Sequence, residues 1–234
     1  MPIPREERVK TGIEGLDNYI QGGFPPSSSI LLIGPPGSGK TIFCNQFIYH
    51  GLTQGEAAIY IVFDAPPNQI KESMEKFGWE IRGKIIIFVD VYSWKTGGVS
   101  ETYSISDPTD LNNFNIALSK AIKELQEKNL KFRTAIDSLS TLFLYVPEDL
   151  CIKFASIILA KFKRAESTQL VVINEGVLSK MAMIKLNSIT DGTIRLNVDE
   201  KGERTLKIER MRETRHTLKN LKFKITDKKG IVIG

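Results

Sequence analysis

A glycine- and proline-rich segment lies between an apolar run and a helical pattern, and it constrains the fold more than any other part of the chain. Residues 34–41 read Gly-Pro-Pro-Gly-Ser-Gly-Lys-Thr. Residues 30–33 before them are all apolar, as expected for a strand that is buried on both faces. After the lysine, apolar residues recur at helical spacing at Ile42, Phe43, Phe47 and Ile48. A strand, a small-residue loop and a helix in this order are typical of an α/β fold.

The segment also fits the phosphate-binding pattern G-x-x-x-x-G-K-[ST]. Small residues let successive backbone N–H groups turn toward a phosphate, and the following helix N-terminus favours an anion. Lys40 is placed to reach the β- and γ-phosphates, and the Thr41 hydroxyl is placed to ligate Mg²⁺. A chance match is the alternative, but strand, loop and helix are all in register. The predicted ligands of ATP or ADP are Gly34, Pro35, Pro36, Gly37, Ser38, Gly39, Lys40, Thr41 and Ile42.

Length and composition are ordinary for a globular protein. The chain has 234 residues, 41% of them hydrophobic and 25% charged, so we expect one α/β domain over residues 1–234, with two small domains as the alternative. No apolar run approaches a membrane span, and the start lacks the apolar core of a signal peptide. Two cysteines are too few for a disulfide framework, so we expect a cytoplasmic protein without membrane contact. The net charge of +5 permits a nucleic acid or acidic partner but does not require one.

Strand-like and helical patterns alternate along most of the chain. Further apolar runs predict strands at 58–63, 84–89, 134–136 and 170–173. Long helices are predicted at 109–128, with Thr109 or Asp110 as N-cap, and at 148–164. This alternation favours a mostly parallel sheet with helices on both faces.

The C-terminal part changes in style. Short runs separated by polar turns suggest an antiparallel extension of the sheet, with strands at 193–198, 206–211, 223–225 and 231–233. Residues 92–106 show no period and are predicted to form a surface loop.

Polar residues at two predicted strand ends are candidate partners of the phosphate loop. Asp137 follows an apolar run and supplies the carboxylate that positions Mg²⁺ in such sites. Asn174 ends the run at 170–173 and is a candidate γ-phosphate sensor, with Glu175 beside it. Strand-end turn residues are the alternative for all three, and the phosphate loop favours the metal role for Asp137.

Several blocks together resemble the KaiC-type domains of the RecA/DnaB-like ATPase superfamily. They are Thr11-Gly12-Ile13-Glu14-Gly15-Leu16-Asp17, Gly22-Gly23-Phe24-Pro25, the phosphate loop, Phe77-Gly78-Trp79, Asp137-Ser138-Leu139-Ser140, Arg210-Met211-Arg212 with Thr214 and His216, and Ile225-Thr226-Asp227. These matches run from about residue 9 to residue 233. The resemblance implies a single-domain relative with a RecA-like, mostly parallel twisted sheet.

The resemblance further implies a ring homo-oligomer, commonly a hexamer, with nucleotide between neighbouring subunits. Arg210 and Arg212 match the two basic residues that reach across to the γ-phosphate as trans arginine fingers. Their spacing of two places both on one face of a strand. A solvated basic edge that discourages strand pairing is the alternative. Glu213 stands where the family commonly has glycine.

Water activation is where the chain departs most from the family pattern. Related ATPases usually carry paired glutamates after the second strand, whereas the corresponding segment here is Phe63-Asp64-Ala65. Asp64 keeps a carboxylate on a stem shorter by one methylene, and a general base must come within about 2.6–3.2 Å of its water. We therefore expect nucleotide binding to survive and hydrolysis to be slow or lost.

One further stretch, Ser188-Ile189-Thr190-Asp191, resembles the segment around the autophosphorylated residues of KaiC. The resemblance raises self-phosphorylation at Ser188 or Thr190 as a hypothesis. Intact-mass measurement after incubation with ATP tests it.

These features predict a slow Mg²⁺-dependent ATPase that acts as an oligomeric nucleotide-state switch in regulation or signalling. One alternative is a catalytically weak or inactive nucleotide-binding module, with Ala65 marking the loss. Another is a recombinase-like accessory that binds single-stranded DNA through basic and aromatic loop residues. Such binding needs several cations, whereas the predicted loop offers one, Lys95, beside its aromatic residues Tyr92, Trp94 and Tyr103.

Overall fold

A ten-stranded sheet runs through the part of the chain that the computed structural model describes, residues 7–97 and 103–234. The strand order is β10-β9-β8-β7-β1-β6-β5-β2-β3-β4. The strands are β1 (Ser29–Gly34), β2 (Ala57–Val62), β3 (Ile86–Asp90), β4 (Tyr103–Ser104), β5 (Phe132–Asp137), β6 (Gln169–Asn174), β7 (Gly192–Val198), β8 (Arg204–Met211), β9 (Leu221–Thr226) and β10 (Gly230–Ile233).

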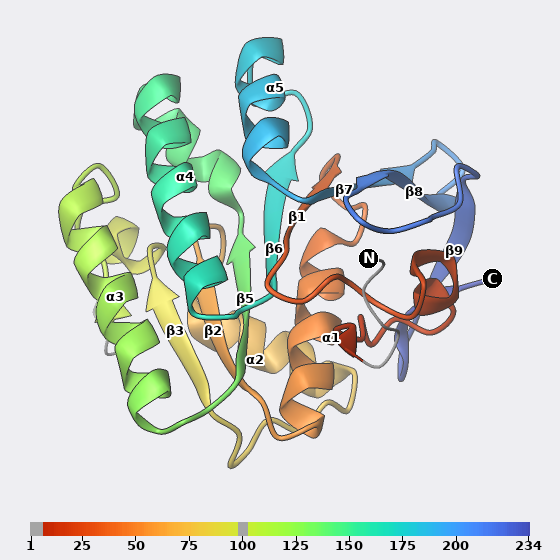
Figure 1. Cartoon of the computed structure of the whole chain (residues 1–234), viewed down its shortest axis with the longest axis horizontal. Coiled ribbons are helices and arrows are strands. Elements are labelled where there is room, and N and C mark those ends of the chain that lie inside the picture. The colour runs from red at the N-terminus through yellow and green to blue at the C-terminus, as the bar shows by residue number, and fades with distance from the viewer. Residues whose placement is uncertain (1–6, 98–102) are drawn as a thin grey trace.

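Helices lie on both faces of this sheet (Figure 1). The α-helices are α1 (Lys40–Thr53), α2 (Pro67–Lys76), α3 (Leu111–Glu127), α4 (Glu148–Arg164) and α5 (Lys180–Ile189). Short 3₁₀ helices are η2 (Leu16–Ile20), η3 (Ser93–Thr96) and η4 (Leu139–Leu144).

Alternation along the central strands divides the core between the two faces. In β1, Leu31 and Ile33 pack into one cluster with α3 and α4, whereas Ile30 and Leu32 pack into a second cluster with α1 and α2. Because successive side chains of a strand point to opposite faces, a strand covered on both sides must be apolar throughout. All six residues of β1 are accordingly buried.

The predicted fold class is confirmed, and the two long helices lie where the sequence placed them. Helix α4 has the predicted bounds, and α3 begins at Leu111 rather than Thr109. Asp110 is the N-cap of α3, since its side chain accepts the backbone N–H of Asn113 at 2.9 Å.

The predicted antiparallel extension is confirmed, and β7 is its first strand. Strand β7 pairs in parallel with β1, with Ile30 opposite Gly192, and in antiparallel fashion with β8, so it joins the parallel part of the sheet to the predicted antiparallel extension. The antiparallel ladders join β7 to β8, β8 to β9, and β9 to β10. Helix α5 supplies the crossover that returns the chain to the start of β7, and its weak apolar pattern gave no clear signal for it.

Residues 92–106 are partly structured rather than a continuous loop. They contain η3 and the short strand β4, which pairs in parallel with β3. Residues 98–102 lie outside the described part of the chain, as do residues 1–6 at the start. No helix within the described ranges is long and apolar enough to cross a membrane.

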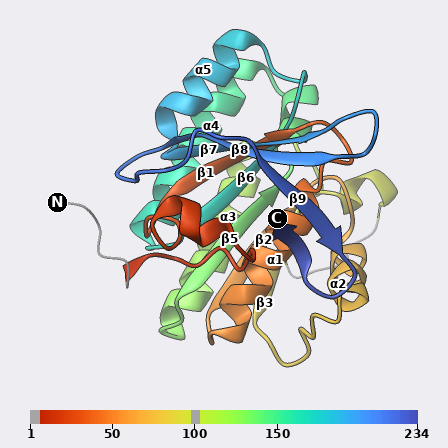
Figure 2. The same cartoon turned by 90° about the vertical axis from the view of Figure 1, so that its right-hand side faces the viewer.

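The C-terminal hairpin β9–β10 folds back beside α1 and the N-terminal segment, close to η2 (Figures 1 and 2). The buried side chain of Gln46, on α1, fastens it there. Its amide nitrogen donates to the carbonyls of Gly12, Lys229 and Ile231 at 2.9–3.1 Å, and its oxygen accepts the N–H of Ile231 at 2.8 Å. The side-chain amide of Gln46 therefore connects α1 to the N-terminal segment at Gly12 and to the C-terminal hairpin.

We expect Gln46→Leu to lower the free energy of unfolding by roughly 2–4 kcal/mol, because it leaves buried backbone groups without partners. Urea denaturation measures this change. Gln69→Ala on the exposed face of α2 is the control and should behave like the wild type. Equal destabilisation by both changes would contradict the role given to Gln46.

Candidate functional site

The sheet topology places the candidate site at the C-terminal ends of four neighbouring strands. Strands β1, β6, β5 and β2 are adjacent and parallel. Gly34 ends β1, Asn174 ends β6, Asp137 ends β5, and Asp64 follows the end of β2 by two residues. In open α/β sheets this edge is where ligands bind. Residues more than a hundred positions apart in the sequence thus meet at one edge.

The phosphate loop needs glycine for two different reasons. Gly39 has φ 101°, a left-handed conformation that other residues rarely adopt. Gly34 has no room for a side chain, since a Cβ there would lie 2.4 Å from the carbonyl oxygen of Leu196. Inside the loop, the Ser38 hydroxyl is buried and has no hydrogen-bond partner among the described residues. An orphaned donor of this kind in a backbone cradle fits a phosphate oxygen.

Lys40 is folded back onto its own loop. Its Nζ donates to the carbonyls of Gly34 at 2.7 Å and Pro35 at 2.8 Å, and the side chain is buried. Burial lowers the pKa of Lys40, and the nearby carboxylates of Asp137 and Asp64 oppose this shift. The ammonium group is therefore held at the loop by weaker acceptors than phosphate oxygens would be.

Asp137 is the buried carboxylate of the site, with 7% of its surface exposed. Its pKa is raised from 3.8 to about 6, mainly by burial and also by the charge of Asp64, while polar contacts with Thr41 and Tyr60 and the charge of Lys40 oppose the rise. A hydroxyl and a buried carboxylate in contact are a suitable pair of oxygen ligands for Mg²⁺. A bound cation would also relieve the cost of burying the carboxylate charge.

Asp64 and Asn174 are joined by hydroxyl groups from the segment that follows β5. Ser138 Oγ donates to Asp64 Oδ2 at 2.8 Å and accepts from Asn174 Nδ2 at 3.1 Å. The Thr141 hydroxyl donates to the other oxygen of Asp64, and Ser140 Oγ accepts the backbone N–H of Asn174 at 2.7 Å. Sequence reasoning selected Asp64 and Asn174 but not the hydroxyls that connect them.

These groups surround a cavity of about 430 Å³. Predicted residues that line it are Pro36, Gly37, Gly39, Lys40, Thr41, Ile42, Asp64, Asp137 and Asn174. The remaining predicted ligands belong to the same loop but do not line the cavity; they are Gly34, Pro35 and Ser38. Glu175 instead forms an ion pair with Arg195 at 2.5 Å.

Two further residues line the cavity that sequence reasoning missed, Arg204 at the start of β8 and Ile225 on β9. The Nε of Arg204 is buried and has no hydrogen-bond partner within the described residues. That orphaned donor would fit an anionic ligand in the cavity. No spacing pattern links Arg204 to the loop, because only the antiparallel return of β8 brings its first residue to this edge.

Arg210 and Arg212 lie at the other end of the sheet. Met211 between them is opposite Gly192, which in turn is opposite Ile30 near the start of β1. The length of β1, roughly 15 Å, therefore separates them from the phosphate loop of the same chain.

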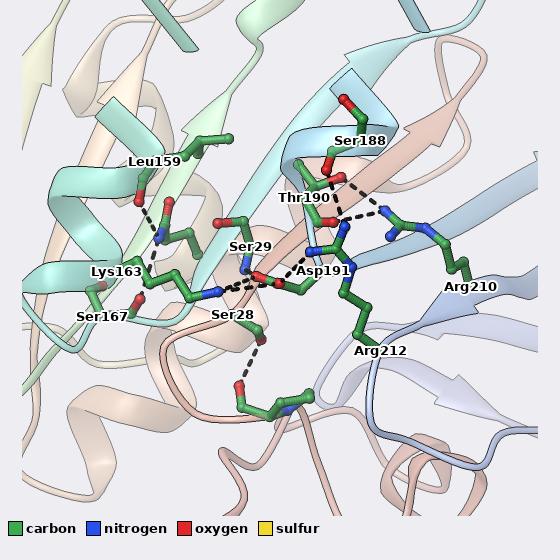
Figure 3. Close-up of polar contacts among 12 residues, drawn as sticks. Ser28, Ser29, Leu159, Lys163, Ser167, Ser188, Thr190, Asp191, Arg210 and Arg212 are labelled. Carbon is green, nitrogen blue, oxygen red and sulfur yellow. Dashed lines mark hydrogen bonds and ion pairs between the residues drawn. The ribbon is translucent and has the colours of Figure 1, made fainter. Parts of the chain in front are cut away.

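Both arginines are held by the C-terminal end of α5 (Figure 3). Arg210 donates to the carbonyls of Asn187 at 2.7 Å and Thr190 at 3.0 Å. Arg212 donates to the carbonyl of Ser188 at 3.1 Å and to Asp191 at 3.4 Å. Both side chains thus reach the same helix end, although Arg212 lies one residue beyond β8 and only Arg210 is part of that strand.

The segment compared with the autophosphorylated stretch of KaiC is not an open loop. Ser188 lies in the last turn of α5, is exposed, and donates to the carbonyl of Lys185 at 2.6 Å. Thr190 is buried, and its hydroxyl donates to the carbonyl of Leu186 at 3.0 Å. Neither lines the cavity beside the phosphate loop.

Comparison with known proteins identifies the family of the chain. The family model of the KaiC ATPases matches residues 9–234. The chain belongs to the KaiC family of ATPases. Its similarity to a UPF0273 protein of Thermotoga maritima is 39% identity over 97% of this chain and 96% of the relative. A UPF0273 protein of Pyrococcus furiosus is 35% identical over 97% and 93%.

A solved structure shows the same fold in a relative. The crystal structure of a KaiC-like protein from the archaeon Pyrococcus horikoshii matches with a TM-score of 0.76 and 29% identity, over 97% of this chain and 98% of that one. Family membership makes the chain an ATP-binding P-loop protein of the KaiC type, and the cavity at the loop is where this family assignment and the geometry coincide.

We expect Asp137→Asn to stabilise the nucleotide-free protein at about pH 7.5 by on the order of 1–3 kcal/mol. The folded-state pKa is raised to about 6, so the folded protein holds this proton more tightly than the unfolded chain. Stability contributed by the protonated form is therefore lost as the pH rises through the interval from the unfolded value of 3.8 to about 6.

Urea denaturation at about pH 4 and about pH 7.5 checks this expectation. The stability that Asp137→Asn gains over the wild type should largely disappear at the lower pH, where the wild-type carboxyl is protonated. Asp149→Asn is the matched control, since that carboxylate is exposed and pairs with Lys185 on the surface. A variant of Asp137 that is less stable than the wild type at the higher pH would contradict the burial argument.

Proposed function

We propose that this protein is a slow Mg²⁺-dependent ATPase, built as a single domain, whose nucleotide state controls its assembly and its action in regulation or signalling. The single observation that carries the proposal is the cavity that unites the phosphate loop with Asp137, Asp64 and Asn174. ATP or ADP would lie with its phosphates on the loop amides, the orphaned Ser38 hydroxyl and Lys40. Lys40 would exchange two carbonyl partners for phosphate oxygens.

Thr41 and Asp137 are the proposed metal ligands. Mg²⁺, when bound, neutralises charge on the β- and γ-phosphates. In this arrangement Thr41 offers its hydroxyl, and Asp137 offers a buried carboxylate whose charge a bound cation would compensate.

Asp64 is the proposed acceptor of a proton from the attacking water. It lines the cavity and is more exposed than Asp137, so a water molecule can reach it. Its stem is one methylene shorter than that of glutamate, and Ala65 offers no second carboxylate. A misplacement of about 1 Å can slow a reaction about a hundredfold, which supports slow turnover.

Arg210 and Arg212 are proposed to act on the nucleotide of a neighbouring subunit. They lie far from the loop of their own subunit, so a trans role in a ring, a hexamer by family analogy, is the arrangement in which they could meet a γ-phosphate. The adjacent face of α5 supports an interface there. Met181 is 59% exposed and Ile184 62% exposed on the same short helix whose end holds the two arginines.

We expect Lys40→Ala to reduce steady-state phosphate release at least tenfold, because it removes the cation that meets the β- and γ-phosphates. The measurement is phosphate release with and without Mg²⁺. Equal release from the wild type and the variant would overturn the ATPase proposal. ATP binding with no release by the wild type would support the nucleotide-binding module instead.

We expect Ile184→Asp to shift the protein toward monomer in the presence of ATP and Mg²⁺, since it places a charge on the proposed interface. Mass photometry or light scattering with and without nucleotide measures the oligomer. Ile116→Asp is the matched control, because Ile116 is 52% exposed on α3, away from the arginines. A wild-type protein that is monomeric under both conditions would rule out the trans role of Arg210 and Arg212.

A further inference from the structure

The carboxylate of Asp64 is held on both oxygens by the chain segment that follows the neighbouring strand. Asp64 lies just beyond β2, and Ser138 and Thr141 lie just beyond β5, with which β2 is paired in parallel. Ser138 donates to Oδ2 at 2.8 Å, and Thr141 donates to Oδ1. An exposed aspartate normally samples several rotamers, and two hydroxyl donors restrict it to one orientation.

The two hydroxyls differ in what else they do. Ser138 is fully buried and also accepts from Asn174 Nδ2 at 3.1 Å, so it connects the two polar side chains that line the cavity beside Asp137. Thr141 is half-buried, and its hydroxyl has Asp64 as its one hydrogen-bond partner within the described residues. Among the two donors, Thr141 is therefore the one whose removal tests the orientation of Asp64 without disturbing Asn174.

The backbone that carries Thr141 is firmly anchored. It lies in η4 between Leu139 and Leu142, both of which are fully buried in the core cluster under α4. A donor on such an element holds its partner in place, whereas a donor on a mobile loop would move with it. The segment after Asp137 thus supplies a fixed support for a carboxylate that comes from a different strand.

We propose that Thr141 is a positioning residue for ATP hydrolysis, which fixes Asp64 so that its free lone pairs face the attacking water. The inference rests on the proposed role of Asp64. In the step, a water oxygen bonds to the γ-phosphorus, the bond from that phosphorus to the β–γ bridging oxygen breaks, and ADP leaves with its electron pair. The water proton passes to the Asp64 carboxylate and is then released with the phosphate product. Thr141 itself neither gains nor loses a proton.

This role explains how a shortened carboxylate can serve in this chain. An aspartate cannot extend as far as a glutamate, so its orientation matters more for the position of the water. Hydrogen bonds that orient a reactive group typically change activity by about ten- to a hundredfold when removed.

The test is Thr141→Val, which keeps the shape of the side chain and removes the donor. We expect kcat to fall about tenfold, with KM and the affinity for ATP analogues unchanged, and Thr141→Ser to retain most of the wild-type kcat. Thr53→Val, at the exposed end of α1, is the matched control and should leave kcat unchanged. Thermal unfolding with ATP and Mg²⁺ shows whether each variant is folded.

A double-variant cycle with Asp64→Asn, followed in single-turnover experiments, separates the two levels of the proposal. If Thr141 acts through Asp64, adding Thr141→Val to Asp64→Asn causes no further loss. If Thr141→Val lowers kcat by the same factor in the Asp64→Asn background as in the wild type, the positioning role is wrong. It is also wrong if Asp64→Asn is impaired while Thr141→Val is as fast as the wild type or faster. Both outcomes leave the proposed role of Asp64 intact. An Asp64→Asn protein with unchanged kcat would remove the proposed role of Asp64 and this inference with it.

Discussion

The site depends on the parallel pairing of β1, β6, β5 and β2, because this pairing brings the ends of four strands to one edge. Backbone hydrogen bonds fix the register, and the register fixes which residue stands at each end. Val62 pairs with Asp137, and Gly34 pairs with Asn174. Covering helices on both faces make this arrangement possible, since strands without a solvated face can be apolar along their whole length. The polar residues of the site therefore begin where the buried strands end.

Much of this arrangement could be predicted from local sequence. The phosphate loop, the central strands and α3 with its Asp110 cap have short-range signals that do not depend on the rest of the chain. The direction of β7 could not be predicted in this way. Its residues form a short apolar run that is compatible with either pairing, and only its contact with β1, far away in sequence, makes it parallel. The antiparallel nature of the three strands that follow it was predicted correctly.

The residues of the site divide in the same way, into those that local sequence predicts and those that only the folded chain brings together. Lys40, Thr41 and Asp137 have recognisable positions in a loop or at a strand end, so their meeting could be anticipated, although the chemical roles given to them stay predictions. Arg204 and Thr141 carry no such signal, because a lone arginine at a strand start and a threonine in a short 3₁₀ helix are common. Their placement follows from the antiparallel return of β8 and from the turn after β5. Sequence reasoning identifies the groups that a reaction needs more readily than the groups that orient them.

The lysine of the phosphate loop has a consequence for the free energy of anion binding. Its two bonds to the carbonyls of Gly34 and Pro35 satisfy the ammonium group in the absence of any anion, so the loop has an internal substitute for part of its ligand. A phosphate that binds Lys40 would therefore take the place of two acceptors that the loop itself supplies. The exchange is one set of oxygen partners for another, so the free energy gained is the difference between the two sets and not the whole strength of the new hydrogen bonds.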